Sequence, residues 1–333
     1  MAAKIITTQD TWDNFVEENS SATLMHRWAF LKTIEKHSNF KLLPYGIYQD
    51  EELICIIPIY YKKVLFNTLL FSPPPKTGIP YLGFVFKEHF FKQRADQKET
   101  FLKTVFTEFE QEIIKINPSY MLITSTPSLT DYRYFLWNQY DLEIKYTYTL
   151  DLTLPLDQLL KNMKDKRRQK ISKAKRENIE ISELETSDII YSFLEEKYSK
   201  QGINLPLLSK DYLDDLKSAF PDNIIFRIAK QDGKVVGTEA LINYKDTHLN
   251  WIGASNTEDR LPTNELLIWD YIEKAKAKNI KQFDLAGANN EKISFFKSQF
   301  GPQLVQYCIL KRTNIWGKIL EKIYLNFIKK SIV

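Results

Sequence analysis

The segment FFKSQFG, residues 295–301, places one lysine among three phenylalanines. Lys297 follows Phe295 and Phe296, and Phe300 comes three residues later. A lysine in such a setting commonly lays its alkyl stem on an apolar edge and leaves its ammonium in water. A fixed ammonium in a partly dry site could instead stabilise negative charge that develops in a reaction. The local sequence leaves both interpretations open.

A carboxylate precedes this segment in a position that could also take part in chemistry. Asp284 ends the apolar run KQFDLAG, which predicts a short strand, and Gly287 follows three residues later. At a splayed strand end the carboxylate could accept a proton from an incoming ammonium nucleophile. Aspartate is also a common turn residue, because it bonds to its own backbone nearby. Both roles are compatible with the sequence.

A third candidate is a basic run between Leu156 and Glu177, which predicts one helix with Pro155 at its start. Its expected inner face is Leu159, Leu160, Met163, Ile171 and Ala174. Its expected outer face carries Lys164, Lys166, Arg167, Arg168, Lys170, Lys173, Lys175 and Arg176. These cations could follow the phosphates of an RNA stem, in a strongly salt-sensitive way, or simply form a solvated face.

Composition narrows the classes of protein to which the chain could belong. A chain of 333 residues, 44% hydrophobic and 26% charged, suggests about two globular domains. The N-terminus has no signal-like apolar region and no stretch reaches the roughly 18 apolar residues that span a bilayer, so we expect a cytoplasmic protein. Cys55 and Cys308 lie in apolar runs and are expected to be buried thiols. Histidine-based zinc motifs and phosphate-binding glycine loops are missing from the sequence, which favours no metal and no mononucleotide cofactor. The net charge of +4 is too small for a DNA-coating protein.

One order of elements occurs twice along the chain. YGIYQDEELICIIPIYY, from Tyr45, and RIAKQDGKVVGTEALIN, from Arg227, align without a gap, and each predicts two strands around a Gln-Asp turn. A helical pattern precedes each hairpin, and a longer helix and a short strand follow each. The first copy has a longer connection, which coincides with the proline-rich FSPPPKTGIPYLGF. We therefore predict a mixed α/β protein in which one module is used twice.

The predicted boundary falls in the strand-like segment YTYTLDLTL, which begins at Tyr146. We expect an N-terminal module over residues 1–148 and a C-terminal module over residues 149–312. The basic helix, residues 156–177, is expected to join them. Residues 313–333 are expected to form a separate amphipathic helix.

This duplicated order resembles the GNAT acyltransferase superfamily, and more specifically the FemAB-like, or Fem-type, aminoacyltransferases that build the peptide bridges of peptidoglycan. The segments that carry the resemblance are KRRQKISKAKRENIEI, DRLPTNELLIWDYIEKAKAKNIKQFDLAG, FFKSQFG, HRWAFL and IIPIYY. The resemblance implies a mixed α/β sheet with two tandem GNAT-like modules. It also implies an acyltransferase of cell-envelope biogenesis, with an amine of an envelope precursor as acceptor.

In the Fem-type pattern an aromatic-lysine pair follows the last strand of the second module and faces the acceptor channel. The resemblance therefore implies that Phe296, Lys297 and Asp284 are catalytic. Attack of an amine on an aminoacyl ester places negative charge on the carbonyl oxygen, which an ammonium could stabilise. The expected acceptor-binding residues are Lys76, Tyr81, Tyr244 and Trp251, although the aromatic ones among them also fit positions in the core.

The donor is the next question. A CoA-binding GNAT protein has a glycine-rich turn whose N–H groups hold the pyrophosphate at a helix N-terminus. The corresponding segment, RLPTNELL, has no glycine and contains Pro262, which lacks an N–H. This favours aminoacyl-tRNA over acyl-CoA. The expected donor-binding residues are Arg260, Asn264, Lys164, Arg167, Arg168 and Lys170. A CoA-dependent N-acyltransferase acting on an amino sugar or surface polymer is the alternative, and a non-catalytic RNA- or envelope-binding protein is a further one.

The C-terminal segment NIWGKILEKIYLNFIKKSIV predicts a helix with one apolar and one basic face. Its expected apolar face is Ile315, Trp316, Ile319, Leu320, Ile323, Phe327 and Ile328, and its expected basic face is Lys318, Lys322, Lys329 and Lys330. Such a helix can lie on the inner face of the cell membrane, with its lysines near anionic lipid. It can equally dock on the protein core.

Overall fold

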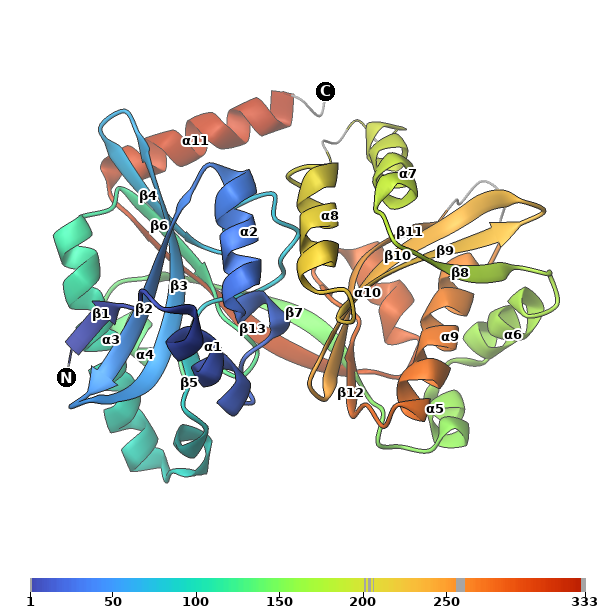
Figure 1. Cartoon of the computed structure of the whole chain (residues 1–333), viewed down its shortest axis with the longest axis horizontal. Helices are drawn as coiled ribbons and strands as arrows, with labels where there is room; N and C mark the ends of the chain where they lie inside the picture. Colours follow the sequence, from blue (N-terminus) through green and yellow to red (C-terminus); the bar gives the residue numbers. More distant parts are fainter. Residues whose placement is uncertain (1, 201, 203–204, 206, 256–260, 331–333) are drawn as a thin grey trace. The chain divides into compact units, whose positions relative to one another are not determined.

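The computed structural model describes residues 2–200, 202, 205, 207–255 and 261–330, and it resolves two compact units (Figure 1). Unit 1 comprises residues 1–144, 206–208 and 307–333, and unit 2 comprises residues 145–205 and 209–306. The chain passes from unit 1 to unit 2 within strand β7 (Asp141–Asp151) and returns within strand β13 (Gln303–Thr313). The boundaries of these units differ from those of the two contiguous modules expected from the sequence. Residues 307–333 belong to unit 1, together with residues 1–144.

Unit 1 is built on a mixed sheet with the strand order β1-β2-β3-β4-β6-β13, and β5 pairs with β3. The neighbours are antiparallel except β4 and β6, which are parallel. Its other strands are β1 (Ala2–Ile5), β2 (Lys41–Gln49), β3 (Glu52–Val64), β4 (Asn67–Ser72), β5 (Val85–Phe86) and β6 (Tyr120–Thr124). Its helices are α1 (Gln9–Glu18), η1 (Leu24–His26), α2 (Trp28–Ser38), η2 (Glu88–Lys92), α3 (Ala95–Ile116), α4 (Arg133–Trp137) and α11 (Ile315–Lys330). A cluster rich in phenylalanine fills its core, with Phe84, Phe106, Phe109 and Phe135 in mutual ring contact.

Unit 2 repeats this plan with the strand order β7-β12-β11-β10-β9-β8, in which only β11 and β12 are parallel. Its other strands are β8 (Glu180–Leu184), β9 (Ile224–Gln231), β10 (Lys234–Tyr244), β11 (Thr247–Ser255) and β12 (Gln282–Asp284). Its helices are α5 (Leu156–Asn162), α6 (Asp165–Ala174), α7 (Asp188–Lys200), α8 (Lys210–Ala219), α9 (Thr263–Ala277) and α10 (Glu291–Ser298). A core around Trp269, Ile272, Phe283 and Phe300 joins α9 to the sheet.

The predicted duplication is confirmed by the two strand orders. Gln49 pairs with Glu52 at the end of the β2–β3 hairpin, and Gln231 pairs with Lys234 at the end of the β9–β10 hairpin. Each hairpin is followed by a third antiparallel strand, a long helix and a parallel strand. The aspartates of the two turns, Asp50 and Asp232, both adopt the left-handed conformation, with φ of 55° and 50°. The two hairpin turns therefore share the left-handed conformation at this aspartate.

The two units differ where their parallel strands part. In unit 2, β11 pairs with β12 only over residues 247–249 and then continues to Ser255 beside β10 alone. The β10–β11 register shifts at Trp251, because Ala240 pairs with Ile252 and Leu241 pairs with Asn250. This bulge bends β11 at the point where it leaves β12. The described residues form no strand along the free edge of β11 beyond Leu249.

In unit 1 the proline-rich loop closes the corresponding gap. The Leu82 N–H donates to the Thr124 carbonyl (3.0 Å), and the Gly83 N–H donates to the Ser72 hydroxyl (3.1 Å). Gly83 has φ 74°, and a Cβ there would approach the Thr124 carbonyl oxygen to 3.1 Å, so a side chain at this position is disfavoured twice. The loop ends in the buried core residue Phe84. Unit 1 has therefore filled the gap with its own chain.

The single basic helix predicted over residues 156–177 is wrong, because the structure has two helices, α5 and α6, and both lie in unit 2. Met163 and Lys164 are extended, and the Lys164 N–H donates to the Gln299 carbonyl at 3.0 Å instead of continuing a helix. Gly301 allows the close approach that this break needs, since a Cβ there would lie 2.6 Å from the Asn162 carbonyl oxygen. A tertiary contact therefore interrupts a locally favourable helix. The predicted joining role of the helix is not seen.

Candidate active site

Lys297 lies in the last turn of α10, and backbone oxygens bind its ammonium. The ammonium donates to the carbonyl oxygen of Ala286 and to that of Gly287, the latter at 3.1 Å. Both residues are in the left-handed region, with φ of 53° and 48°, in the loop after β12. Burial lowers the pKa of Lys297 to about 8, while the negative charge of Asp284 acts in the opposite direction. The side chain is therefore not a lysine that leaves its charge in solvent.

Asp284 ends β12 at the point where β11 and β12 part, since it pairs with Leu249 in their ladder. Its side chain is almost fully buried. One carboxylate oxygen accepts hydrogen bonds from the Thr147 hydroxyl (2.6 Å) and from the Ala286 N–H (2.8 Å). The second bond is the local turn expected for an aspartate followed by a loop. It also shapes the loop whose next carbonyls hold Lys297, so the carboxylate and the ammonium belong to one site.

Phe296 anchors α10 from the neighbouring position. Its ring packs against the core of unit 2, makes an edge contact with Phe300 at 5.4 Å between centroids, and lies 4.4 Å from the guanidinium carbon of Arg167. This contact is close enough for a cation–π interaction. By contrast, Phe295 is largely exposed. The aromatic-lysine pair thus has one residue that fixes the helix and one that carries the charge.

The arginines of α6 form internal contacts. Arg167 is buried, forms an ion pair with Glu265 in the first turn of α9, and donates to the Gln299 side chain at 3.0 Å. Lys170 pairs with the same Glu265 at 3.0 Å. Arg168 donates to the Leu160 and Met163 carbonyls at 3.0 and 2.9 Å, and so satisfies the C-terminus of α5. These positions do not suit the predicted phosphate contacts of Arg167 and Arg168, because their guanidinium groups are already used inside unit 2.

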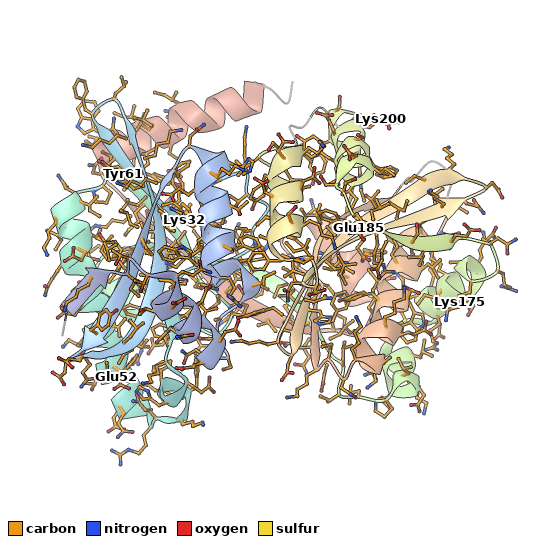
Figure 2. All side chains as sticks on the ribbon, viewed as in Figure 1. Lys32, Glu52, Tyr61, Lys175, Glu185 and Lys200 are labelled. Carbon is orange, nitrogen blue, oxygen red and sulfur yellow. The ribbon has the colours of Figure 1, made fainter. Side chains whose placement is uncertain are left out.

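The exposed cations of this region are Lys164, Lys166, Lys173, Lys175 and Arg176. Lys164 lies over the ring of Phe295, with its Nζ 5.9 Å from the ring centroid. Lys175, the C-cap residue of α6 (labelled in Figure 2), pairs with Glu273 at 2.9 Å. Among them, Lys166 and Lys173 remain the best placed for a ligand's phosphates, because the one ion pair of Lys173, with Glu177, is long at 3.8 Å.

The N-terminus of α9 carries the remaining predicted donor residues. Asn264 is half-buried in its first turn, whereas Arg260 lies outside the described residues. Pro262 is the N-cap and offers no N–H, and the Glu265 carboxylate already occupies the first turn. A carboxylate there interacts favourably with the helix dipole, and it engages Arg167 and Lys170 within unit 2. The start of α9 thus offers a pyrophosphate no N–H at its N-cap.

The predicted acceptor residues are not brought together as a set within either unit. Lys76 is exposed on the loop of unit 1 that closes its gap. Tyr81, in the same loop, is buried and packs against Tyr307 at 5.5 Å. Tyr244 and Trp251 are buried in unit 2. For the three aromatic residues the structure agrees with the core interpretation, so their predicted contact with an acceptor is not supported.

Sequence reasoning missed three features of this site. Thr147 reads as an ordinary residue of an alternating strand, and its bond to Asp284 spans 137 positions. The Ala286 and Gly287 carbonyls belong to the backbone, so no residue type in the sequence identifies them as partners of Lys297. Glu265 could have been noticed as an acidic residue in the first turn of a helix, where carboxylates are favoured.

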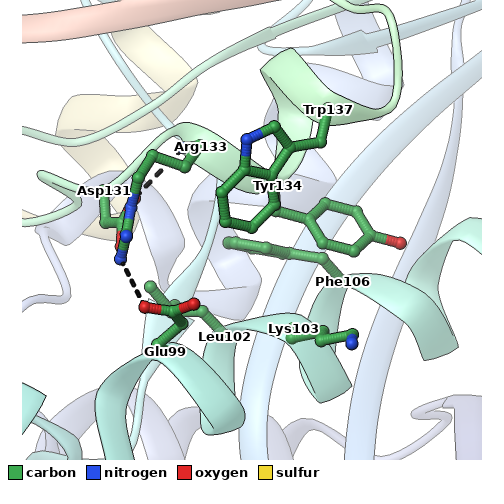
Figure 3. Close-up of a pocket in the computed structure, with 8 residues that line it drawn as sticks. All are labelled: Glu99, Leu102, Lys103, Phe106, Asp131, Arg133, Tyr134 and Trp137. Carbon is green, nitrogen blue, oxygen red and sulfur yellow. Dashed lines mark hydrogen bonds and ion pairs between the residues drawn. The ribbon is translucent and has the colours of Figure 1, made fainter. Parts of the chain in front are cut away.

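A separate hollow lies in unit 1 between α3 and α4 (Figure 3). Phe106, Tyr134 and Trp137 form its aromatic wall. Arg133 pairs there with Asp131 at 2.7 Å and with Glu99 at 3.0 Å. The charged groups of the hollow are therefore engaged with one another. In unit 1 the strand in the place of β12 is β6 (Tyr120–Thr124), which contains no acidic residue, so β6 offers no counterpart of Asp284.

A family model matches within unit 2, and known structures match the whole fold. Residues 161–298 match the family model of the acetyltransferase (GNAT) domain. The fold is similar to a crystal structure of FemX, with a TM-score of 0.68 and 12% identity over 92% of this chain and 97% of that chain. It is also similar to L-PGS from Bacillus licheniformis, with a TM-score of 0.54 and 11% identity over 92% of each chain. A tandem GNAT protein from the clavulanic acid biosynthesis pathway matches with a TM-score of 0.51 and 8% identity over 93% of this chain and 98% of that chain. No curated protein matches by sequence.

Proposed function

We propose that this chain transfers an aminoacyl group from aminoacyl-tRNA to an amine of a cell-envelope precursor. The proposal is supported by the match of residues 161–298 to the acetyltransferase (GNAT) domain and by the similarity of the fold to FemX and to a tandem GNAT protein. One observation carries the proposal. The strands β11 and β12 part beside Asp284 and Lys297, so an extended acyl donor can enter next to a carboxylate and an ammonium held by two carbonyls.

The chemistry divides between these two side chains. The attacking amine reaches the ester as an ammonium ion and must lose a proton, which the Asp284 carboxylate accepts. Attack then places negative charge on the ester carbonyl oxygen, and the Lys297 ammonium stabilises that oxygen. The ester bond breaks, an amide bond forms, and the ribose hydroxyl leaves with a proton. Thr147 keeps Asp284 in position throughout.

The donor is assigned to tRNA because of the start of α9. Pro262 leaves the N-cap without an N–H, and Glu265 engages Arg167 and Lys170, so this end of α9 is less suited to a CoA pyrophosphate, whereas the exposed Lys166 and Lys173 suit the phosphates of an RNA stem. The likeness to FemX and to L-PGS shows only the fold, and it is compatible with this assignment. A CoA-dependent N-acyltransferase is the alternative, and the GNAT domain match favours it to the same degree.

A donor comparison tests the proposal. Full-length protein is assayed by filter binding with total aminoacyl-tRNA, with the same tRNA after deacylation, and with radiolabelled acetyl-CoA. We expect retention of charged tRNA and label transfer to a lysine-containing muropeptide precursor. Lys297→Met should retain the tRNA and lose the transfer. Tight binding of acetyl-CoA without retention of tRNA would overturn the proposal in favour of the CoA alternative.

A further inference from the structure

Two exposed apolar elements lie at one edge of unit 1. The first is the tip of the β3–β4 hairpin, where Leu65 is 86% exposed and Phe66 is fully exposed. Leu65 takes the left-handed conformation, with φ 54°, so the tip is a tight turn. Two large apolar side chains at the end of a hairpin add nothing to the core. Exposed apolar side chains that do not serve the core are typical of a surface that binds a partner or a membrane.

The second element is α11, which docks through its less apolar side. A Cβ at Gly317 would collide with the Ser119 carbonyl oxygen, so the helix backbone packs directly on the start of β6. One turn later, the Glu321 carboxylate accepts from the Tyr120 hydroxyl at 3.3 Å and pairs with Lys311 at 3.4 Å. The large apolar side chains point away from this contact. They are Ile315, Trp316, Ile319 and Ile323, which are 71%, 62%, 45% and 48% exposed.

Both elements are attached to the same residue. The Ser119 N–H donates to the Thr68 carbonyl at 2.8 Å, next to the hairpin tip, and the Asn314 N–H donates to the Ser119 carbonyl at 3.1 Å, at the start of α11. We call the six apolar residues of the two elements the edge patch; they are Leu65, Phe66, Ile315, Trp316, Ile319 and Ile323. The patch is thus one surface of unit 1.

The charges around the edge patch have one sign. Lys62 and Lys63 flank the hairpin tip, and Lys318 and Lys322 are exposed on α11. The one acidic residue within residues 61–68 and 314–323 is Glu321, whose charge is neutralised by Lys311 on the docked side. Exposed apolar side chains with lysines in the same two segments are complementary to a bilayer with anionic headgroups. None of the described helices is long and apolar enough to cross a membrane, so any such contact lies on the surface.

We propose that the edge patch binds unit 1 to the surface of a membrane that contains anionic phospholipid. The apolar side chains enter the boundary between headgroups and acyl chains, and the lysines contact the lipid phosphates. This inference goes beyond the proposed transfer reaction, and it stands on residues that the candidate active site does not use.

Vesicle sedimentation of the full-length chain tests the proposal. We expect the protein to sediment with vesicles of phosphatidylcholine mixed with phosphatidylglycerol and to remain in the supernatant with phosphatidylcholine alone. Leu65→Ser with Phe66→Ser should weaken binding about tenfold or more. Lys318→Glu with Lys322→Glu should do the same at low salt. Trp316→Phe keeps an apolar side chain and should bind normally, while it loses fluorescence quenching by brominated phosphatidylglycerol.

Matched controls decide the outcome. Leu136→Ser with Trp137→Ser removes two apolar side chains from α4 that are 57% and 61% exposed, and Lys92→Glu with Lys103→Glu reverses two exposed charges on other elements. Both should sediment like the unmodified protein. Equal losses in these controls, or no sedimentation of the unmodified protein with anionic vesicles, would refute the membrane assignment. A dimer that becomes monomeric in the patch variants, without vesicle binding, would make the patch a contact between copies of the chain and likewise overturn it.

Discussion

The hydroxyl of Thr147 donates a 2.6 Å hydrogen bond to the carboxylate of Asp284. This bond ties the end of β12 to β7 at the point where β11 turns away, and it fixes the carboxylate that the proposed reaction uses as a base. Thr147 itself is fully buried. It is therefore a positioning residue, and its contribution can be measured apart from that of Asp284.

Thr147→Val should lower kcat about tenfold with little change in KM, because the isosteric side chain keeps the packing but removes one of the hydrogen bonds that orient the Asp284 carboxylate. Loss of the donor to a buried carboxylate should also lower the free energy of unfolding by about 1–3 kcal/mol. Steady-state kinetics and urea unfolding measure the two effects. Thr147→Ser, which restores the hydroxyl, is the control and should recover most of kcat. A kcat that does not change in Thr147→Val would show that Asp284 needs no orientation.

Removal of the Lys297 charge should abolish transfer. Lys297→Met loses the group that stabilises the carbonyl oxygen, which typically costs about 2.7–4 kcal/mol of barrier, or a hundredfold to a thousandfold in kcat. Burial lowers the pKa of Lys297 to about 8, so the required ammonium is lost as pH rises through that value, and kcat should fall above about pH 8. Lys297→Arg keeps its charge at all these pH values. Its residual activity should lack the alkaline decline, and persistence of that decline would assign it to another group.

The same pKa shift links Lys297 to stability. The pKa is about 8 in the folded chain and 10.5 for an unperturbed lysine, so below pH 8 both states are protonated. Between these values the unfolded state binds more protons, and stability therefore rises with pH. Relative to Lys297→Met, the unmodified protein should gain up to about 3 kcal/mol in unfolding free energy from pH 8 to pH 10.5. Urea titrations of both proteins at several pH values measure this difference. A constant difference would mean that the ammonium is solvated.

Two classes of cation in the basic region should behave differently. Arg167→Met leaves the buried Glu265 with only Lys170, and should lower stability by about 3–5 kcal/mol. Lys166→Ala with Lys173→Ala should leave thermal unfolding unchanged and reduce the slope of log affinity for tRNA against log salt by roughly 1.5. Filter binding across a salt series measures the slope. If the slope stays the same, these lysines form only a solvated face.

Gly253 offers a test of the donor entry beside β11. It is exposed, lies beyond the point where β11 leaves β12, and a Cβ there would meet its nearest neighbour, the Thr238 carbonyl oxygen, at an ordinary 3.4 Å. Gly253→Val should therefore fold normally and weaken donor binding at least tenfold, since the side chain narrows the entry. Because unit 1 has closed its own gap, titration of the unmodified protein should give one donor per chain. Two equivalent sites would contradict this difference between the units.

The fold was largely predictable because its signals are local. Two ungapped hairpin segments around Gln49 and Gln231, each flanked by helical periodicity, were sufficient for the duplication. The failure at residues 156–177 came from a distant contact. Helix propensity continues through Met163 and Lys164, and only the bond to the Gln299 carbonyl, supplied 135 positions later, ends it. Periodicity contains no information about such a partner.

The site was predictable only in part for the same reason. Lys297 and Asp284 could be selected by residue type and by order along the chain. Whether the ammonium is solvated depends on two left-handed residues in a loop, and Ala286 is not a residue type that predicts that conformation. Likewise Arg167 looked like a surface cation, and its burial depends on Glu265, which is 98 positions away.

The return of the chain to unit 1 within β13 has a consequence for synthesis on the ribosome. The strand that pairs with β6 and supplies the core residues Cys308 and Leu310 is translated after nearly all of unit 2. While unit 2 is translated, the edge of β6 that later pairs with β13 therefore stays unpaired. Unit 2, whose residues are contiguous apart from 206–208, can complete its sheet earlier. We expect nascent chains that stop near Gln306 to hold a protease-resistant second half and a protease-sensitive first half, in the reverse of the order in which the halves are made.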